Sequence, residues 1–124
     1  MVDKVAKVSV IFYAEGGQAP ALEWLMAQPE KGQDKFSVVI ELLEENGSTL
    51  KRPYAAPLRD KIYELRVRWR RVNYRLLYFF HGNNVAVLAH GCTKEAQVDA
   101  ADINRAIVRR NEFIRDPKGH THGE

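Results

Sequence analysis

The feature of this sequence that most constrains its fold is an alternation of apolar and charged residues from Ile62 to Arg70. Side chains alternate between the two faces of a β-strand, so this pattern predicts a strand with one apolar and one charged face. The apolar face consists of Tyr63, Leu65, Val67 and Trp69, and the charged face of Glu64, Arg66, Arg68 and Arg70. We therefore expect a sheet with a core on one side and a row of arginines on the other.

Positive charge is concentrated around this strand. Nine of the nineteen Lys and Arg residues lie between positions 51 and 75, although the net charge of the 124-residue chain is only +3. A basic row on a rigid sheet holds phosphate groups in fixed positions, which a flexible basic tail does not. The sequence pI of about 9.1 fits a nucleic-acid partner, although many proteins without such a partner share it.

A second predicted strand, from Val72 to Phe80, aligns with the first as an antiparallel hairpin. If Tyr63 faces Tyr78, every pair on that face is apolar, which is what selects a register. The other pairs on this face are Leu65 with Leu76, Val67 with Tyr74, and Trp69 with Val72. Arg70 and Arg71 then form a two-residue turn, although neither favours positive φ, and a longer loop or a bulge is the alternative.

The same register places Arg66 opposite Arg75 on the other face of the hairpin. Two like charges directly opposite one another destabilise a sheet by a few tenths to about 1 kcal/mol. A carboxylate from Glu64 or Asp60 would neutralise them, and so would a substrate phosphate. Residues that break a local rule in this way are often functional.

Hydrophobic periodicity and turn residues predict the remaining elements. They are a strand at 5–14, helices at 20–29 and 31–45, a loop at 51–60, strands at 62–69, 72–80 and 85–90, and a helix from Asp99 to about residue 114. We therefore predict a single α+β domain, residues 1–115. It has a small, mostly antiparallel twisted sheet, an N-terminal αα-hairpin packed on this sheet, and a C-terminal helix. Residues 116–124 are predicted to form a disordered tail.

Several kinds of protein are disfavoured by the sequence. The single cysteine, Cys92, cannot form a disulfide within the chain, and no CxxC or Cys/His zinc motif is present. No carboxylate cluster or HExxH motif indicates a catalytic metal, so we expect neither a metal nor a cofactor. The N-terminus lacks the apolar segment of a signal peptide, and no apolar run is long enough to cross a membrane. We expect a soluble cytoplasmic protein without a membrane partner.

Short motifs of the chain resemble the RelE/HigB toxin superfamily, and most closely its phage-derived HigB-like branch. The resemblance rests on the order and spacing of four segments, Leu58–Arg66, Tyr74–Phe80, Val87–Lys94 and Ile103–Phe113. It covers most of the chain up to about residue 114. It implies a RelE-like fold and the toxin of a type II toxin–antitoxin pair. It also implies a cognate antitoxin with its own DNA-binding domain, of the helix-turn-helix kind.

Toxins of this superfamily cleave messenger RNA, commonly on the translating ribosome and without a metal. The resemblance implies that Arg75 contacts the scissile phosphate, with Arg66 beside it and Lys94 near the far side. The RNA 2′-hydroxyl attacks the adjacent phosphorus, and a guanidinium suits this reaction because it holds two phosphate oxygens in a fixed plane. The leaving 5′-oxygen needs a proton, for which His90 is the first candidate by its ordinary pKa and Lys94 the second.

Four further basic residues are candidates for RNA contacts that position the backbone. They are Lys61, Arg68, Arg70 and Arg71. Two residues depart from the superfamily pattern. Glu64 stands where some relatives have a second lysine, and Glu95 follows Lys94 where further basic residues are usual.

Two other functions stay open. A ParE-like toxin has a similar fold but inhibits DNA gyrase and cleaves no RNA. The row of Arg66, Arg75 and Lys94 argues against it, because ParE-type proteins largely lack such a row. A degenerate phage-derived protein that only binds RNA is the other alternative, and the acid at Glu95 keeps it open.

Overall fold

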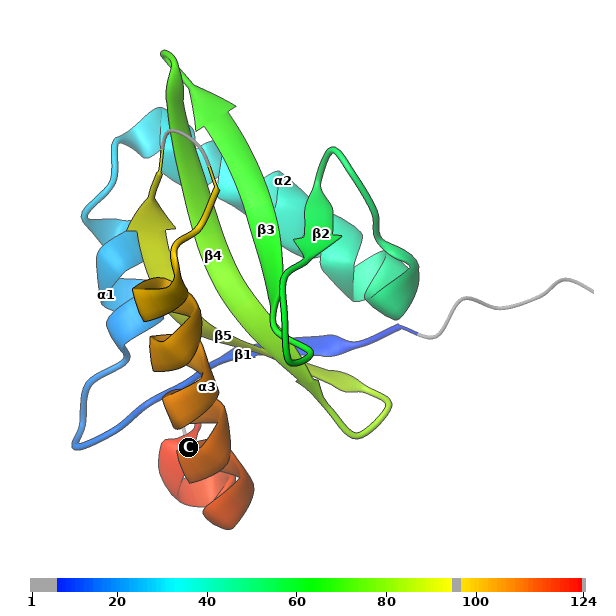
Figure 1. The fold of residues 1–124 in the computed structure, drawn as a ribbon, viewed down its shortest axis with the longest axis vertical. Helices are drawn as coiled ribbons and strands as arrows, with labels where there is room; N and C mark the ends of the chain where they lie inside the picture. The colour runs from blue at the N-terminus through cyan, green and yellow to red at the C-terminus, as the bar shows by residue number, and fades with distance from the viewer. Residues whose placement is uncertain (1–6, 95–96, 124) are drawn as a thin grey trace, which may run out of the picture.

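The computed structural model describes residues 7–94 and 97–123 as one small α+β domain (Figure 1). The start of the predicted first strand and the unusual Glu95 lie outside these described residues. In chain order the strands and α-helices are β1 (Ser9–Phe12), α1 (Pro20–Met26), α2 (Glu30–Asn46), β2 (Ala55–Pro57), β3 (Tyr63–Trp69), β4 (Val72–His81), β5 (Val85–Thr93) and α3 (Ala100–Arg115). Short 3₁₀ turns lie at Gly47–Thr49 and Lys118–His120. The predicted single α+β domain is therefore confirmed.

The five strands form one mixed sheet in the order β1-β5-β4-β3-β2. β1 is parallel to β5, whereas the three other pairings are antiparallel, as predicted for most of the sheet. Within the β4–β5 pairing, Tyr78 pairs with Leu88 but Leu77 pairs with His90. β5 therefore contains one extra residue, Ala89, which forms a β-bulge there.

The hairpin of β3 and β4 has the predicted register from Tyr63 opposite Tyr78 to Trp69 opposite Val72. The turn is the two-residue form, because the φ angles of Arg70 and Arg71 are 50° and 67°. Both arginines thus adopt the left-handed conformation that a tight hairpin requires and that side chains other than glycine, asparagine and aspartate disfavour. Register selection by the apolar face outweighs the local preference of the turn residues.

α1 and α2 cover one face of the sheet, as predicted for the N-terminal αα-hairpin (Figure 1). Their apolar stripes pack on the predicted apolar face of β3 and β4. The buried residues of this core are Val8, Ala21, Leu25, Phe36, Val39, Leu43, Ala55, Leu65, Val67, Tyr74, Leu76, Tyr78, Ala86 and Leu88. Trp24 of α1 and Phe36 of α2 meet edge to face with 6.1 Å between ring centroids, which joins the two helices above the sheet.

α3 covers part of the opposite face, where Phe113 packs on Phe79 of β4. The helix begins as predicted, because the side chain of Asp99 accepts a hydrogen bond from the backbone N–H of Asp102 at 3.1 Å. The loop end of the β3–β4 hairpin extends beyond α3 (Figure 1). The charged side of this hairpin is therefore covered at one end and open at the other.

Two segments differ from the sequence prediction. The predicted loop at 51–60 contains β2, a three-residue edge strand that pairs with β3 and ends at Pro57, where a missing N–H is tolerated. Residues 116–123, predicted as a disordered tail, instead lie against β1 and the residues after it. The ring of His120 stacks on Tyr13, Thr121 forms a β-bridge to the same tyrosine, and His120 Nδ1 lies 2.8 Å from the carbonyl oxygen of Ala14. Within the described residues, no helix has the length and apolar character needed to cross a membrane.

Candidate nucleic-acid interface

Three neighbouring strands bring the principal predicted phosphate ligands into one row. Arg66 of β3 is the partner of Arg75 of β4, and Arg75 is in turn the partner of Cys92 of β5. This row lies on the face of the sheet that carries α3, because Leu77 and His90 pair two residues further along the same face. The predicted cross-strand arginine pair is therefore present.

A hollow of about 540 Å³ opens where β3 continues past its pairing with β2. Its lining consists of Lys35, Val38, Val39, Pro53, Tyr54, Arg66, Val67, Arg68, Asn73 and Arg75. We call this hollow the basic groove, since four of its ten described lining residues are cationic and none of them is acidic. Val38 and Tyr54 are large apolar side chains exposed at its rim, at 57% and 43%. The groove thus combines cationic side chains with an exposed aromatic ring.

Arg75 is buried in an ion pair at the base of this groove. Its Nη1 donates to Oε1 of Glu64 at 2.8 Å, and the two residues are only 6% and 4% exposed. Of the two carboxylates expected to neutralise the arginine pair, Glu64 does so, whereas Asp60 pairs with Arg59 at 2.6 Å. A phosphate that approaches Arg75 must compete with Glu64, and the half-buried Arg66 is the more accessible ligand.

His90 lies under the first turns of α3, and both nitrogens of its ring have partners. Nε2 lies 2.7 Å from Oδ1 of Asp102, and Nδ1 lies 3.4 Å from Nη1 of Arg109, which also donates to the carbonyl oxygen of Ala89 at 2.7 Å. A neutral ring that carries its proton on Nε2 fits these partners. Burial lowers the pKa of His90 more than the Asp102 carboxylate raises it. This geometry gives little support to the predicted role of His90 as proton donor.

Lys94 is held at the N-terminus of α3 by two carboxylates. Its Nζ lies 3.1 Å from Oδ2 of Asp99 and 3.1 Å from Oδ2 of Asp102. The hydrogen bonds that Lys94 donates to Asp99 and then to Asp102 raise the pKa of Lys94. The pKa of Asp99 is lowered, first by the backbone N–H of Asp102 and then by Lys94. Lys94 is therefore a fixed cation at neutral pH, which suits charge stabilisation better than proton transfer.

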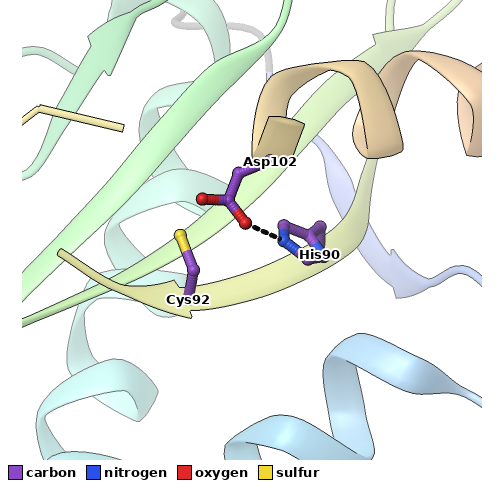
Figure 2. A group of neighbouring side chains, drawn as sticks. All are labelled: His90, Cys92 and Asp102. Atoms are coloured by element: carbon purple, nitrogen blue, oxygen red, sulfur yellow. Dashed lines mark hydrogen bonds and ion pairs between the residues drawn. The ribbon is translucent and has the colours of Figure 1, made fainter. Parts of the chain in front are cut away.

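Sequence reasoning missed a cluster formed by His90, Cys92 and Asp102 (Figure 2). One potential ligand atom from each residue lies within 4.8 Å of those of the other two. The sequence alone could have placed His90 and Cys92 together, because residues 90 and 92 share one face of a strand. Asp102 reaches them only through the packing of α3. Burial raises the pKa of Cys92 to about 12, so its thiol is protonated. Nitrogen, sulfur and oxygen ligands in this combination are a donor set that zinc accepts.

The predicted backbone-positioning residues fall into two groups. Arg68, Arg70 and Arg71 are exposed at the hairpin end of the sheet, where Arg68 lines the basic groove and Arg70 stacks its guanidinium 4.7 Å from the ring of Trp69. Lys61 lies just before the other end of β3, a strand that is about 20 Å long at 3.3 Å per residue. The structure therefore does not bring Lys61 together with the arginines of the hairpin.

Comparison with known proteins identifies the family of this chain. A search of curated protein sequences finds no match. Residues 23–111 match a family model described as Phage derived protein Gp49-like (DUF891). The matched segment contains all of β2 to β5 and most of α3, and with them the arginine row and the His90 cluster. The chain belongs to the Gp49-like family of phage-derived proteins, a family associated with RelE-like toxins of toxin–antitoxin pairs.

Proposed function

We propose that this protein is a RelE/HigB-like toxin of a type II toxin–antitoxin pair and that it cleaves messenger RNA on the translating ribosome. The observation that carries this proposal is the basic groove, which gathers Arg66, Arg68 and Arg75 on two rigid strands. The association of the Gp49-like family with RelE-like toxins supports the toxin assignment. Side chains on a sheet hold a phosphate in one geometry, which catalysis requires and mere binding does not.

In the proposed reaction, the RNA 2′-hydroxyl attacks the adjacent phosphorus while the bond to the 5′-oxygen breaks. Arg66 contacts the scissile phosphate, and Arg68 and Lys35 hold neighbouring phosphates along the groove. Tyr54, exposed at the rim, offers a ring on which a base stacks. Cations that are already in place when charge develops on the phosphate commonly make the largest contribution to the rate.

Arg75 is the second phosphate ligand in this proposal, and Glu64 sets its orientation. The buried ion pair fixes the guanidinium in the row next to Arg66. The phosphate then completes a site in which two arginines face one carboxylate and one phosphate. Glu64 stands where some related toxins have a second lysine. The site of this protein therefore carries less positive charge at residue 64 than the sites of those toxins.

We propose that Lys94 stabilises negative charge at the far side of the row and that His90 supports it. His90 binds one oxygen of Asp102, whereas Lys94 binds the other at 3.1 Å. Removal of His90 therefore takes away one hydrogen-bond partner of Asp102 and weakens the hold of Asp102 on Lys94, which keeps its other partner Asp99. The lowered pKa of His90 and the raised pKa of Lys94 both favour this positioning role over direct proton transfer near neutral pH.

The proposed antitoxin contributes an inhibitory segment that covers the basic groove, in addition to a helix-turn-helix domain that binds DNA. The groove is cationic along Lys35, Arg66 and Arg68, whereas its rim exposes Val38 and Tyr54. A segment that carries both carboxylates and apolar side chains matches this surface.

A second candidate is a ParE-like toxin that binds DNA gyrase and cleaves no RNA. Two observations favour it. The guanidinium of Arg75 is paired with the buried Glu64, and the ammonium of Lys94 is paired with two carboxylates. Two of the three predicted phosphate cations are thus neutralised within the protein. Arg66 is the residue on which the nuclease proposal depends most.

The proposal is tested by mapping new 5′ ends of RNA in bacterial cells after induction of the protein. The informative variant is Arg66→Ala, because this half-buried side chain lines the groove and, within the described residues, belongs to neither hydrophobic core cluster. The matched control is Arg115→Ala, which removes an exposed arginine at the end of α3 whose guanidinium pairs with Glu112 at 3.2 Å. Both variants are purified, and their thermal unfolding is compared with that of the wild type.

New cuts within translated messages that vanish in Arg66→Ala and persist in Arg115→Ala are the expected result. Growth arrest without RNA cuts would refute the nuclease and favour the gyrase-binding alternative, which a supercoiling assay then checks. Neither arrest nor cuts, with RNA binding intact, would favour the degenerate RNA-binding protein.

A further inference from the structure

We propose that His90, Cys92 and Asp102 form a binding site for one zinc ion at the junction of β5 and α3. This inference goes beyond the proposed RNA cleavage and does not depend on it. The three residues supply a nitrogen, a sulfur and an oxygen, and their potential ligand atoms already lie within 4.8 Å of one another (Figure 2). Zinc sites with three protein ligands leave a fourth position for water or another ligand.

One of the distances among these atoms is already close to that of a tetrahedral site. Zinc bonds of about 2.0–2.1 Å to nitrogen or oxygen and about 2.3 Å to sulfur place ligand atoms roughly 3.3–3.6 Å apart. The Nε2 of His90 and the Oδ1 of Asp102 are 2.7 Å apart because a hydrogen bond joins them. Replacement of this bond by a zinc ion requires them to separate by less than about 1 Å. The sulfur of Cys92 lies within 4.8 Å of the other two ligand atoms and must move closer to them by no more than about 1.5 Å.

The backbone that carries these residues is fixed on both sides. His90 follows the Ala89 bulge of β5, and Cys92 pairs with Arg75 of β4. Asp102 lies in the first turn of α3, whose start is fixed by the Asp99 cap. A preformed site of this kind loses little conformational freedom when it binds a metal.

Proton and charge balance also fit the site. Zinc takes the lone pair of Nε2, so the neutral imidazole carries its proton on Nδ1 instead. Arg109 then loses its 3.4 Å contact with Nδ1 but keeps its bond to the carbonyl oxygen of Ala89. Zinc displaces the proton of Cys92 to solvent, because a coordinated thiol is deprotonated even where the free thiol is not. The thiolate and Asp102 then balance the two charges of the ion, while Lys94 keeps its partner Asp99.

The nearby cations Arg75, Lys94 and Arg109 oppose a divalent ion, whereas Asp99 and Glu64 offset part of their charge. We therefore expect a site that binds one zinc ion per chain and weakens as the pH falls. Release of one proton from Cys92 predicts an affinity that changes by about tenfold per pH unit.

The untagged full-length chain is titrated with Co²⁺ as a spectroscopic stand-in for zinc, and with Zn²⁺ by calorimetry. Cys92 is the only cysteine of the chain, so a thiolate-to-cobalt charge-transfer band can come only from this residue. The variants are Cys92→Ser and Asp102→Asn. The matched control is the double variant His120→Gln/His122→Gln, which removes the His-x-His pair of the C-terminal segment but leaves the cluster intact.

The expected result is a charge-transfer band that saturates at one Co²⁺ per chain and is displaced by Zn²⁺. The band should be absent in Cys92→Ser, and the dissociation constant should rise at least about tenfold in Asp102→Asn. The tail control should bind as the wild type does. A wild type without the band, or zinc binding that disappears only in the tail control, would overturn the proposal. Because the wild-type band alone identifies Cys92, this conclusion stands even where Cys92→Ser fails to fold.

Discussion

Replacement of Glu64 by glutamine tests how much the buried ion pair with Arg75 contributes to stability. Glutamine keeps the size of the side chain and one acceptor oxygen, but it removes the carboxylate charge that pairs with the guanidinium of Arg75, which is only 6% exposed. Loss of one partner of a buried pair typically costs about 3–5 kcal/mol. We expect a loss of about 3 kcal/mol, the lower end, because the hydrogen-bond acceptor remains.

Urea unfolding at neutral pH, followed by circular dichroism, measures this loss. With an m-value of about 2 kcal/mol/M, a loss of 3 kcal/mol lowers the midpoint by about 1.5 M. The double variant Glu64→Gln/Arg75→Met removes the buried guanidinium as well. Its loss should be smaller than the sum of the two single losses by about 1–3 kcal/mol, because the two residues are in direct contact.

A Glu64→Gln variant with a midpoint close to that of the wild type would refute this reasoning. Such a result would mean that water or another group replaces the carboxylate without penalty and that Arg75 is accessible through the groove. The measurement also decides how an inactive Arg75→Ala variant is read. If the pair is worth about 3 kcal/mol, a protein of typical stability, about 5–15 kcal/mol, stays mostly folded without it, so a large loss of activity would come from the missing phosphate ligand rather than from unfolded protein.

Three further predictions concern stability. Gly91→Ala should destabilise the protein by about 1–3 kcal/mol in urea unfolding, because the added Cβ overlaps the indole ring of Trp24, and unchanged stability would show that α1 shifts freely. Arg71→Gly should stabilise it by about 0.5–1 kcal/mol, because glycine adopts the φ of 67° without strain; a loss of stability would contradict the two-residue turn. Because burial lowers the pKa of His90, the unfolded chain binds more protons below pH about 6.5, so stability should fall as the pH drops from there. His90→Gln should flatten this decline in unfolding curves between pH about 5 and 7, and an unchanged slope would mean that His90 is solvated.

The β3–β4 hairpin could be predicted in full because its signal is local and repeated. Each residue of the alternation adds to the same register, and a shift by one position would turn every apolar side chain of β3 to the wrong face. The two arginines of the turn disfavour the positive φ angles of a two-residue loop, but the apolar pairing of the two strands outweighs this local preference. β2 was missed for the opposite reason, since a three-residue strand between Pro53 and Pro57 has too short a pattern to distinguish it from a loop.

Only the part of the candidate site that lies on the β3–β4 hairpin could be predicted from the sequence. Arg66 and Arg75 were placed opposite one another from the sequence, and Glu64 was one of two candidates for their counter-charge. That Arg75 would be buried with Glu64 could not be read from the alternation, because a charged face of a strand looks the same whether solvent or another residue covers it. The groove also needs Lys35 and Tyr54, which come from segments that only folding brings to β3.

The sequence by itself determined the α-helices, four of the five strands of the sheet, the register of one hairpin and the row of arginines, because these depend on neighbours along the chain or on one repeated pattern. The tertiary structure alone decided the parallel pairing of β1 with β5, the position of the C-terminal segment against Tyr13, and the meeting of Asp102 with His90 and Cys92. Those contacts join residues that are far apart or on different elements. Their free energy comes from burial and pairing in the folded state, for which no local pattern is required.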